Sequence, residues 1–482
     1  MHIRYGSYLA ALAIGLMLEG SPRPARGVTG AELVVPQSTA VRHGLTRAWF
    51  AQIPIGGRAR IAYIVQDEGT LFVQTSDAML YAIDAETGRT VWSQQVGSPG
   101  RPTMRPGANG RAAADPSDAA LVDTLLNKTE QTDKAISARH DKVVAVANGT
   151  TLYLLNRADG SVYLDPKNNI PWKVTLYSAP ESGALVTGEM VFIPTVQGPI
   201  AVYPIIDSRG SPTNLPSTGH CIAPPVQVGD RIAWATDKGV VHFTKPKSVE
   251  LRHRIETTGP ITAMLTPDPP RAFGGSIDGF LYCFNENSGD ISWKLTVGSA
   301  VRESPVVVRG AVFVASEAGG MFRASTADGR QDWFNPAARH FLAASTSKVY
   351  ALDAYGHMLI INAKTGATID TFAMPEAVLP VENGLTDRIY LTSDTGLIQC
   401  LHEPGLVQPQ NYAPPKPVEK PPEDTKPKAA APKPKAADDA EKPKPAAKEP
   451  AAPKEKAAPK EKPPTADTPT PAPKRPAKAN MP

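Results

Sequence analysis

Short apolar strands separated by glycine-containing turns make up most of this chain. The pattern is clearest in residues 276–298, where the turn Asp278-Gly279 leads into an alternating apolar run at residues 280–284. A second turn at residues 287–289 is followed by a strand that carries Trp293. Turn glycines supply positive φ at little steric cost, and period-two runs between them are typical of half-buried strands. The pattern therefore predicts an all-β fold.

The same unit recurs along the chain. We aligned the copies on the residue that precedes the apolar strand, and these positions are Ala78, Thr150, Gly198, Gly239, Gly279, Gly319, Gly356 and Gly396. The last six steps run from 37 to 48 residues, and the first step, of 72, indicates an insertion. A four-stranded unit repeated about every 40 residues is the signature of a β-propeller blade, so the sequence predicts an eight-bladed β-propeller.

The repeated motif resembles the pyrroloquinoline quinone (PQQ)-type propeller repeat. Its strand of the type Leu80-Tyr81-Ala82-Ile83-Asp84 is followed by a Thr87-Gly88 turn and by Trp92. The resemblance covers residues 45–403. Quinoprotein dehydrogenases use this repeat around a cofactor, whereas the outer-membrane assembly factor BamB and its relatives use it as a binding scaffold. The recurring tryptophan is expected to pack between neighbouring blades, where its large area is buried.

The two ends of the repeat region are complementary. The last repeat, residues 377–402, has three strands and then reaches Pro404-Gly405 without a fourth. The early segment around Trp49 resembles the last strand of a blade, as at residues 90–96. We therefore expect this N-terminal strand to complete blade 8 and close the ring, which removes exposed sheet edges.

Three segments do not fit the repeat. Residues 1–30 contain an apolar run of about 11 residues, too short to span a bilayer, and are expected to be a signal peptide. Residues 98–138 form the insertion, with an irregular first part and a helix expected between residues 117 and 132. Residues 404–482 hold 22 of the 49 prolines. Such a tail cannot bury enough surface to offset its ordering entropy and is expected to be disordered.

Charge excludes a nucleic-acid binder. The net charge is +4, and the tail contributes +6 of it, which leaves −2 for the rest of the chain. A propeller close to neutrality offers no basic field for DNA or RNA. The expected partners are unidentified envelope proteins, with no membrane span in the mature chain, and we expect a monomer in the periplasm or cell envelope.

A catalytic site is not expected from the sequence. The resemblance implies that a PQQ dehydrogenase would carry a vicinal Cys-Cys pair, calcium-binding Glu and Asn residues and a catalytic Asp. The cysteines here are isolated and are expected to be buried apolar residues (Cys221, Cys283 and Cys400). Repeated aspartates are expected to hydrogen-bond turn backbones (Asp77, Asp84, Asp278, Asp353 and Asp394). His242 and His253 are expected to be surface residues. No catalytic, cofactor or metal residue is therefore assigned.

Binding through surface loops is the class of function that remains. In propellers, the loops that join one blade to the next line the mouth of the central channel, and here they include Arg302, Glu303, Arg339 and His340. These residues are candidates for binding a peptide or polar ligand. The sequence favours a non-enzymatic exported scaffold that mediates protein–protein interaction in the envelope. The alternatives are a PQQ-dependent dehydrogenase and a propeller that binds or senses a small ligand or polysaccharide.

Overall fold

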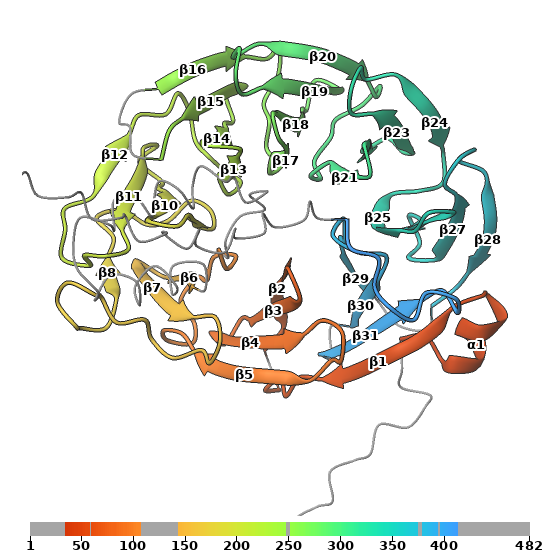
Figure 1. The fold of residues 1–482 in the computed structure, drawn as a ribbon, viewed down its shortest axis with the longest axis horizontal. Helices are drawn as coiled ribbons and strands as arrows, with labels where there is room; N and C mark the ends of the chain where they lie inside the picture. Colours follow the sequence, from red (N-terminus) through yellow and green to blue (C-terminus); the bar gives the residue numbers. More distant parts are fainter. Residues whose placement is uncertain are drawn as a thin grey trace, which may run out of the picture. The chain divides into compact units, whose positions relative to one another are not determined.

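The computed structural model shows eight antiparallel sheets arranged as the blades of a ring (Figure 1). It describes residues 34–57, 59–107, 143–246, 251–374, 378–393 and 396–412. The prediction of an eight-bladed propeller is confirmed. The signal peptide of residues 1–30, the helix expected at residues 117–132 and the tail beyond Tyr412 lie outside the described residues.

Seven blades have four named strands, and blade 2 has three. Blades 1 to 4 consist of β2(Ile61–Asp67), β3(Thr70–Thr75), β4(Met79–Asp84) and β5(Thr90–Gln95); β6(Val143–Asn148), β7(Thr151–Asn156) and β8(Lys173–Thr175); β9(Leu185–Val186), β10(Met190–Pro194), β11(Ile200–Pro204) and β12(Thr213–Leu215); and β13(Val226–Val228), β14(Arg231–Ala235), β15(Val240–Thr244) and β16(Leu251–Glu256).

Blades 5 to 8 follow the same order. They consist of β17(Thr266–Asp268), β18(Arg271–Gly275), β19(Phe280–Asn285) and β20(Ile291–Thr296); β21(Val306–Val308), β22(Ala311–Ala315), β23(Met321–Ser325) and β24(Gln331–Asn335); β25(His340–Ala344), β26(Lys348–Leu352), β27(Met358–Asn362) and β28(Thr368–Phe372); and β29(Val378–Val381), β30(Ile389–Ser393) and β31(Leu397–His402) with β1(Thr46–Gln52). One helix, α1(Gln37–Arg42), precedes β1 in the described part of the chain.

The N-terminal strand closes the ring, as predicted. β1 pairs antiparallel with β31, and Trp49 lies opposite Cys400 in that register. Figure 1 shows the red β1 beside the blue β31. The segment before β1 is also part of the core, since Val34 and Val35 are fully buried. The Val35 N–H donates to Gln399 Oε1 at 2.9 Å, and Gln399 Nε2 donates back to the Val35 carbonyl at 2.7 Å.

Each recurring tryptophan docks on the next blade, which confirms the predicted packing. Its indole N–H donates to a backbone carbonyl in the turn between the third and fourth strands of the neighbour, within 2.7–3.3 Å (Trp49 to Ala85, Trp92 to Arg157, Trp293 to Thr326 and Trp333 to Ala363). The ring lies flat against the turn glycine. A Cβ on Gly88 would lie 2.4 Å from Trp49 Cε3, so this turn needs glycine both for contact and for its φ of 72°.

Blades 4 and 7 carry other residues at the tryptophan position. In blade 4 the equivalent position is His253, which packs on Gly289. In blade 7 it is Asp370, which accepts a hydrogen bond from His43 Nδ1 at 2.6 Å. His43 follows α1 and stacks on Phe372 with ring centroids 4.3 Å apart. The N-terminal segment therefore fills the space between blades 7 and 8 that an indole occupies elsewhere.

Other predictions at single residues have mixed outcomes. Cys221, Cys283 and Cys400 are buried and unpaired, as expected. Asp84, Asp278 and Asp353 each accept backbone N–H bonds within their turns, as expected. Asp77 instead accepts a bond from the Thr75 hydroxyl, and Asp394 lies outside the described residues.

The prediction that His242 is a surface residue was wrong. His242 is fully buried and stacks on Trp234, with ring centroids 5.0 Å apart. Its Nε2 accepts the Thr218 N–H at 3.1 Å. Burial lowers the pKa of this imidazole to about 4, so the ring is neutral near neutral pH.

The inner strand of blade 2 comes from a segment predicted to be irregular. Thr103 pairs with Asn148 and Gly107 with Ala145, both antiparallel. Gly107 and Ala145 exchange backbone bonds of 2.9 and 2.7 Å. The extra residues therefore enter between the first and second strands of blade 2, rather than between blades 1 and 2.

The antiparallel strands give the ring two faces. We call the linker face the one that carries the blade-to-blade connections and the turns between second and third strands. The opposite face, which carries the turns between first and second strands and between third and fourth strands, is called the hairpin face.

β31 ends at the hairpin face, where the chain continues to Tyr412 rather than leaving the propeller at Pro404 as predicted. The Tyr412 hydroxyl donates to the Ala344 carbonyl at 2.8 Å, and its ring lies under Arg309.

Candidate functional site: the central channel

The blades converge on a cavity of about 180 Å³ in the central channel. Its walls come from the inner strands of several blades and from the residues just before them. Apolar side chains form most of the wall, including Val65, Leu185, Val226, Leu265 and Val306. Arg105, Glu382, Gln66, Ser304 and Thr266 add polar groups. An apolar cavity with a few convergent polar groups is the usual form of a ligand site.

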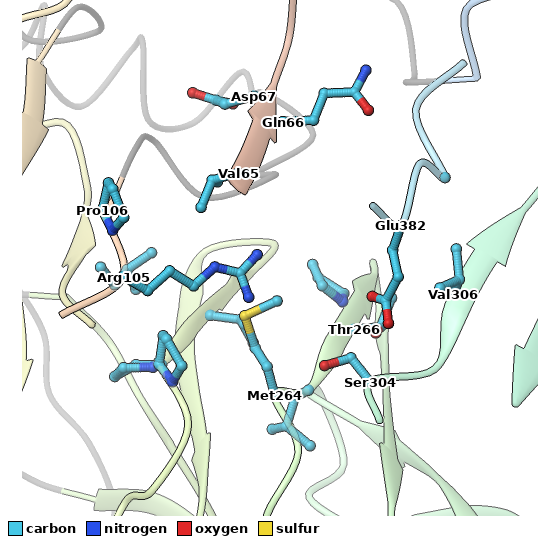
Figure 2. Close-up of a pocket in the computed structure, with 18 of the residues that line it drawn as sticks. Val65, Gln66, Asp67, Arg105, Pro106, Met264, Thr266, Ser304, Val306 and Glu382 are labelled. Atoms are coloured by element: carbon cyan, nitrogen blue, oxygen red, sulfur yellow. The ribbon is translucent and has the colours of Figure 1, made fainter. Parts of the chain in front are cut away.

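Arg105 reaches this cavity from the inner strand of blade 2. Its neighbour Met104 packs into the core between blades 2 and 3, so the alternation of a strand directs Arg105 away from that core. Figure 2 shows the guanidinium pointing into the cavity beside Met264. The inner strands of blades 2 and 3 approach closely here: a Cβ on Gly107 would lie 2.0 Å from the Ala184 carbonyl oxygen.

Glu382 reaches the cavity from blade 8, directly after β29. Its position is fixed by Asn383, whose backbone N–H donates to the Leu342 carbonyl at 2.7 Å. The Asn383 side chain donates to the Arg388 carbonyl at 2.6 Å and accepts the Leu385 N–H at 2.9 Å. Figure 2 shows the carboxyl of Glu382 directed toward Ser304 and Thr266.

The two charges alter each other's electrostatics. The side chain of Glu382 is exposed, and the space that it faces is lined by protein from several blades. Burial, together with the nearby negative charge of Glu303, raises the pKa of Glu382 to about 7, against the opposing effect of Arg105 and His340. Burial likewise lowers the pKa of Arg105, which Glu382 and Tyr63 partly offset. An arginine stays protonated nonetheless.

The four residues predicted at the channel mouth form two kinds of contact. Glu303 and His340, from blades 6 and 7, bond to each other, and this bond raises the pKa of His340. Arg302 Nε donates to Glu317 Oε2 at 3.0 Å within blade 6, and both side chains are more than half exposed. Arg339 lies against Gly319 of blade 6. The structure therefore brings Glu303 and His340 together beside Glu382 and leaves Arg302 on the rim.

The sequence reasoning missed Arg105 and Glu382. Arg105 lies in a Pro- and Gly-rich stretch whose only large apolar residue nearby is Met104, so no period-two pattern marked it as an inner strand. Glu382 precedes Asn383-Gly384, which resembles an ordinary solvated turn. Aligning the inner strands of all blades on their first hairpin would have pointed to both residues.

No group of three or more His, Cys, Asp or Glu side chains in the described ranges could hold a metal ion. Across those same ranges, no helix is long and apolar enough to cross a membrane.

Comparison with known proteins adds the family. The family model described as outer membrane protein assembly factor BamB matches residues 46–162 and 256–378. This chain is a PQQ-like β-propeller protein, similar to the BamB family. The crystal structure of BamB from Moraxella catarrhalis matches the PQQ-like propeller with a TM-score of 0.53 and 16% identity, over 74% of this chain and 97% of that one.

A designed propeller shares the same architecture. The computationally designed Ika8 protein matches with a TM-score of 0.50 and 12% identity, over 73% of this chain and 100% of that one. At these identities the solved structures establish the fold of the PQQ-like propeller alone. A search of curated protein sequences found no match.

Proposed function

We propose that this protein is an exported, non-enzymatic scaffold that binds other proteins of the cell envelope. The observation that carries the proposal is the match to the BamB family model on both sides of the ring, in blades 1–2 and 5–7. The description of that family names a role in outer-membrane protein assembly. Envelope partners and a periplasmic location follow from this similarity.

The linker face is the proposed binding surface. Four large apolar side chains lie exposed in its loops and turns (Tyr177, Val196, Ile222 and Tyr355). Tyr355 is 85% exposed. Exposed aromatic and aliphatic residues are common anchors of protein interfaces. The hairpin face is less available, because residues 404–412 cross its loops in blades 6 to 8.

Export would be directed by the predicted signal at residues 1–30. Val34 and Val35 are fully buried, so a cleavage compatible with the fold must precede Val34. The predicted boundary satisfies this condition. Mass spectrometry of the mature N-terminus in the native host tests it: a new terminus within about the first 33 residues is expected, and an intact Met1 would contradict cleavage.

Site-specific photo-crosslinking tests the proposed surface. A photoreactive residue placed at Tyr355 or Ile222 on the linker face should form discrete adducts with envelope proteins. Matched positions on the hairpin face, Glu86 and Lys364, are exposed and serve as controls. Adducts from the hairpin-face positions alone would contradict the assignment of the binding surface to the linker face. An absence of adducts from all four positions would contradict the scaffold role.

The dehydrogenase alternative has a separate test. A PQQ enzyme should bind PQQ with calcium and then reduce a dye in the presence of an alcohol or sugar. We expect no spectral change when PQQ is titrated into the purified protein. The polysaccharide-sensing alternative is not favoured by the family match.

A further inference from the structure

Two opposite charges face the same cavity of the channel without bonding to each other or to any other group that the structure describes. Arg105 enters from blade 2 and Glu382 from blade 8, and Figure 2 shows their charged ends directed into the space between. Each still affects the ionisation of the other. They are therefore near enough to interact through space, yet neither has a hydrogen-bond partner among the described residues.

This arrangement is costly for the folded protein alone. A charged group that protein encloses and leaves unpaired has a higher free energy than the same group in water. Elsewhere the same chain pairs such groups: Arg157 bonds to both the side chain and the carbonyl of Asp67 between blades 1 and 2. The contrast indicates that Arg105 and Glu382 are held apart, so that a third group can complete the pairing.

The rest of the cavity fits a small polar molecule. A volume of about 180 Å³ accommodates on the order of ten water molecules. Ser304 and Thr266 lie near Glu382, and Met264 with the surrounding aliphatic residues forms an apolar floor.

We propose that this cavity binds a small zwitterionic molecule of the amino-acid or short-peptide class. Its carboxylate would receive hydrogen bonds from the Arg105 guanidinium, which matches carboxylates geometrically. Its ammonium group would donate to the Glu382 carboxylate. This ligand site goes beyond the scaffold role and does not depend on it.

Direct binding measurements on the full mature chain test the proposal. Ligand-observed NMR titrations at mildly alkaline pH, where the Glu382 carboxyl is ionised, would use glycylglycine as the zwitterion. Propionate and propylammonium are the matched probes with a single charge. Glycylglycine should bind saturably, and each single-charge probe should bind at least tenfold more weakly, because each leaves one protein charge without its partner.

Variants assign the binding to this site. Arg105→Gln and Glu382→Gln should each weaken glycylglycine binding at least tenfold, and Arg105→Gln should retain weak binding of propylammonium. Arg330→Gln, in the exposed turn between β23 and β24 on the hairpin face, is the control and should bind as the wild type. Thermal unfolding verifies that each variant is folded. If one of the two variants does not fold, the other still tests the site.

Several results would overturn the proposal. It fails if none of the three probes binds at millimolar concentration. It also fails if propionate binds as tightly as glycylglycine, or if both folded glutamine variants bind glycylglycine like the wild type. The photo-crosslinking result is independent of these outcomes, so failure of the ligand site and failure of the scaffold role can be told apart.

Discussion

At the scale of single residues, neighbouring blades are held together by contacts between a tryptophan of one repeat and a turn glycine of the next repeat. The indole of Trp92 donates to the Arg157 carbonyl and covers Gly160, so one blade's tryptophan needs the next blade's glycine. The sequence predicted that the tryptophans pack between blades, because their spacing follows the repeat. It did not predict His242 as a core residue, because nothing in the sequence shows that Trp234 and Thr218 surround it.

The tryptophan–glycine contact predicts a difference between two glycine substitutions. Gly88→Ala should cost about 1 kcal/mol for the left-handed backbone and a further 1–3 kcal/mol for displacing Trp49. Gly356→Ala has a similar backbone conformation but open space around it, so it should cost only about 1 kcal/mol. Chemical denaturation of both variants measures this. Equal losses of stability would contradict the role given to the contact.

The buried imidazole of His242 predicts a pH dependence. Its pKa falls from 6.5 to about 4 on folding, so the unfolded state binds the proton more tightly between these values. The stability contributed by the neutral ring is complete above about pH 6.5 and is lost as the pH falls toward 4. At about pH 5 the loss should be of order 2 kcal/mol.

Substitution separates this effect from other titrations. His242→Gln keeps an acceptor for the Thr218 N–H but does not titrate. Its free energy of unfolding, measured by denaturation at about pH 7 and about pH 5, should therefore fall by less than that of the wild type. An identical pH dependence in both proteins would contradict the assignment.

At the scale of elements, the strands with a clear period-two pattern and a following turn were predicted, and the atypical ones were not. The strand at Trp49 was identified because it resembles the last strand of a blade, and its pairing with β31 confirms the ring closure. The inner strand of blade 2 was not predicted because residues 103–107 show no period-two pattern of apolar side chains, and in the structure it pairs through two isolated bridges. This omission hid Arg105, and with it half of the candidate ligand site.

The segment before α1 predicts a stability effect of truncation. A chain that starts at Ala31 should be as stable as the mature protein. A chain that starts at Gln37 loses the burial of Val34 and Val35 and leaves Gln399 without its backbone partners, so it should lose at least about 3 kcal/mol. Thermal and chemical unfolding compare the two. Equal stability would show that the segment is not part of the closure.

At the scale of the whole molecule, the ring has two faces, and we propose that only the linker face binds partners. The chain enters and leaves on the hairpin face, where α1 leads into β1 and where Arg388 donates to the Leu406 and Val407 carbonyls at 2.8 and 2.6 Å. The linker face, with its exposed apolar side chains, remains open. Tyr412, the last residue that the structure describes, therefore lies on the face opposite the proposed binding surface.

The most direct test of the scaffold role is crosslinking in the native host followed by affinity purification, with the full chain and with a version that ends at Tyr412. This end point keeps the contacts of Tyr412 with Ala344 and Arg309. We predict that both forms recover the same envelope partners, because the propeller is the binding element. Recovery of partners by the full chain alone, or by neither form, would contradict the proposed role of the propeller.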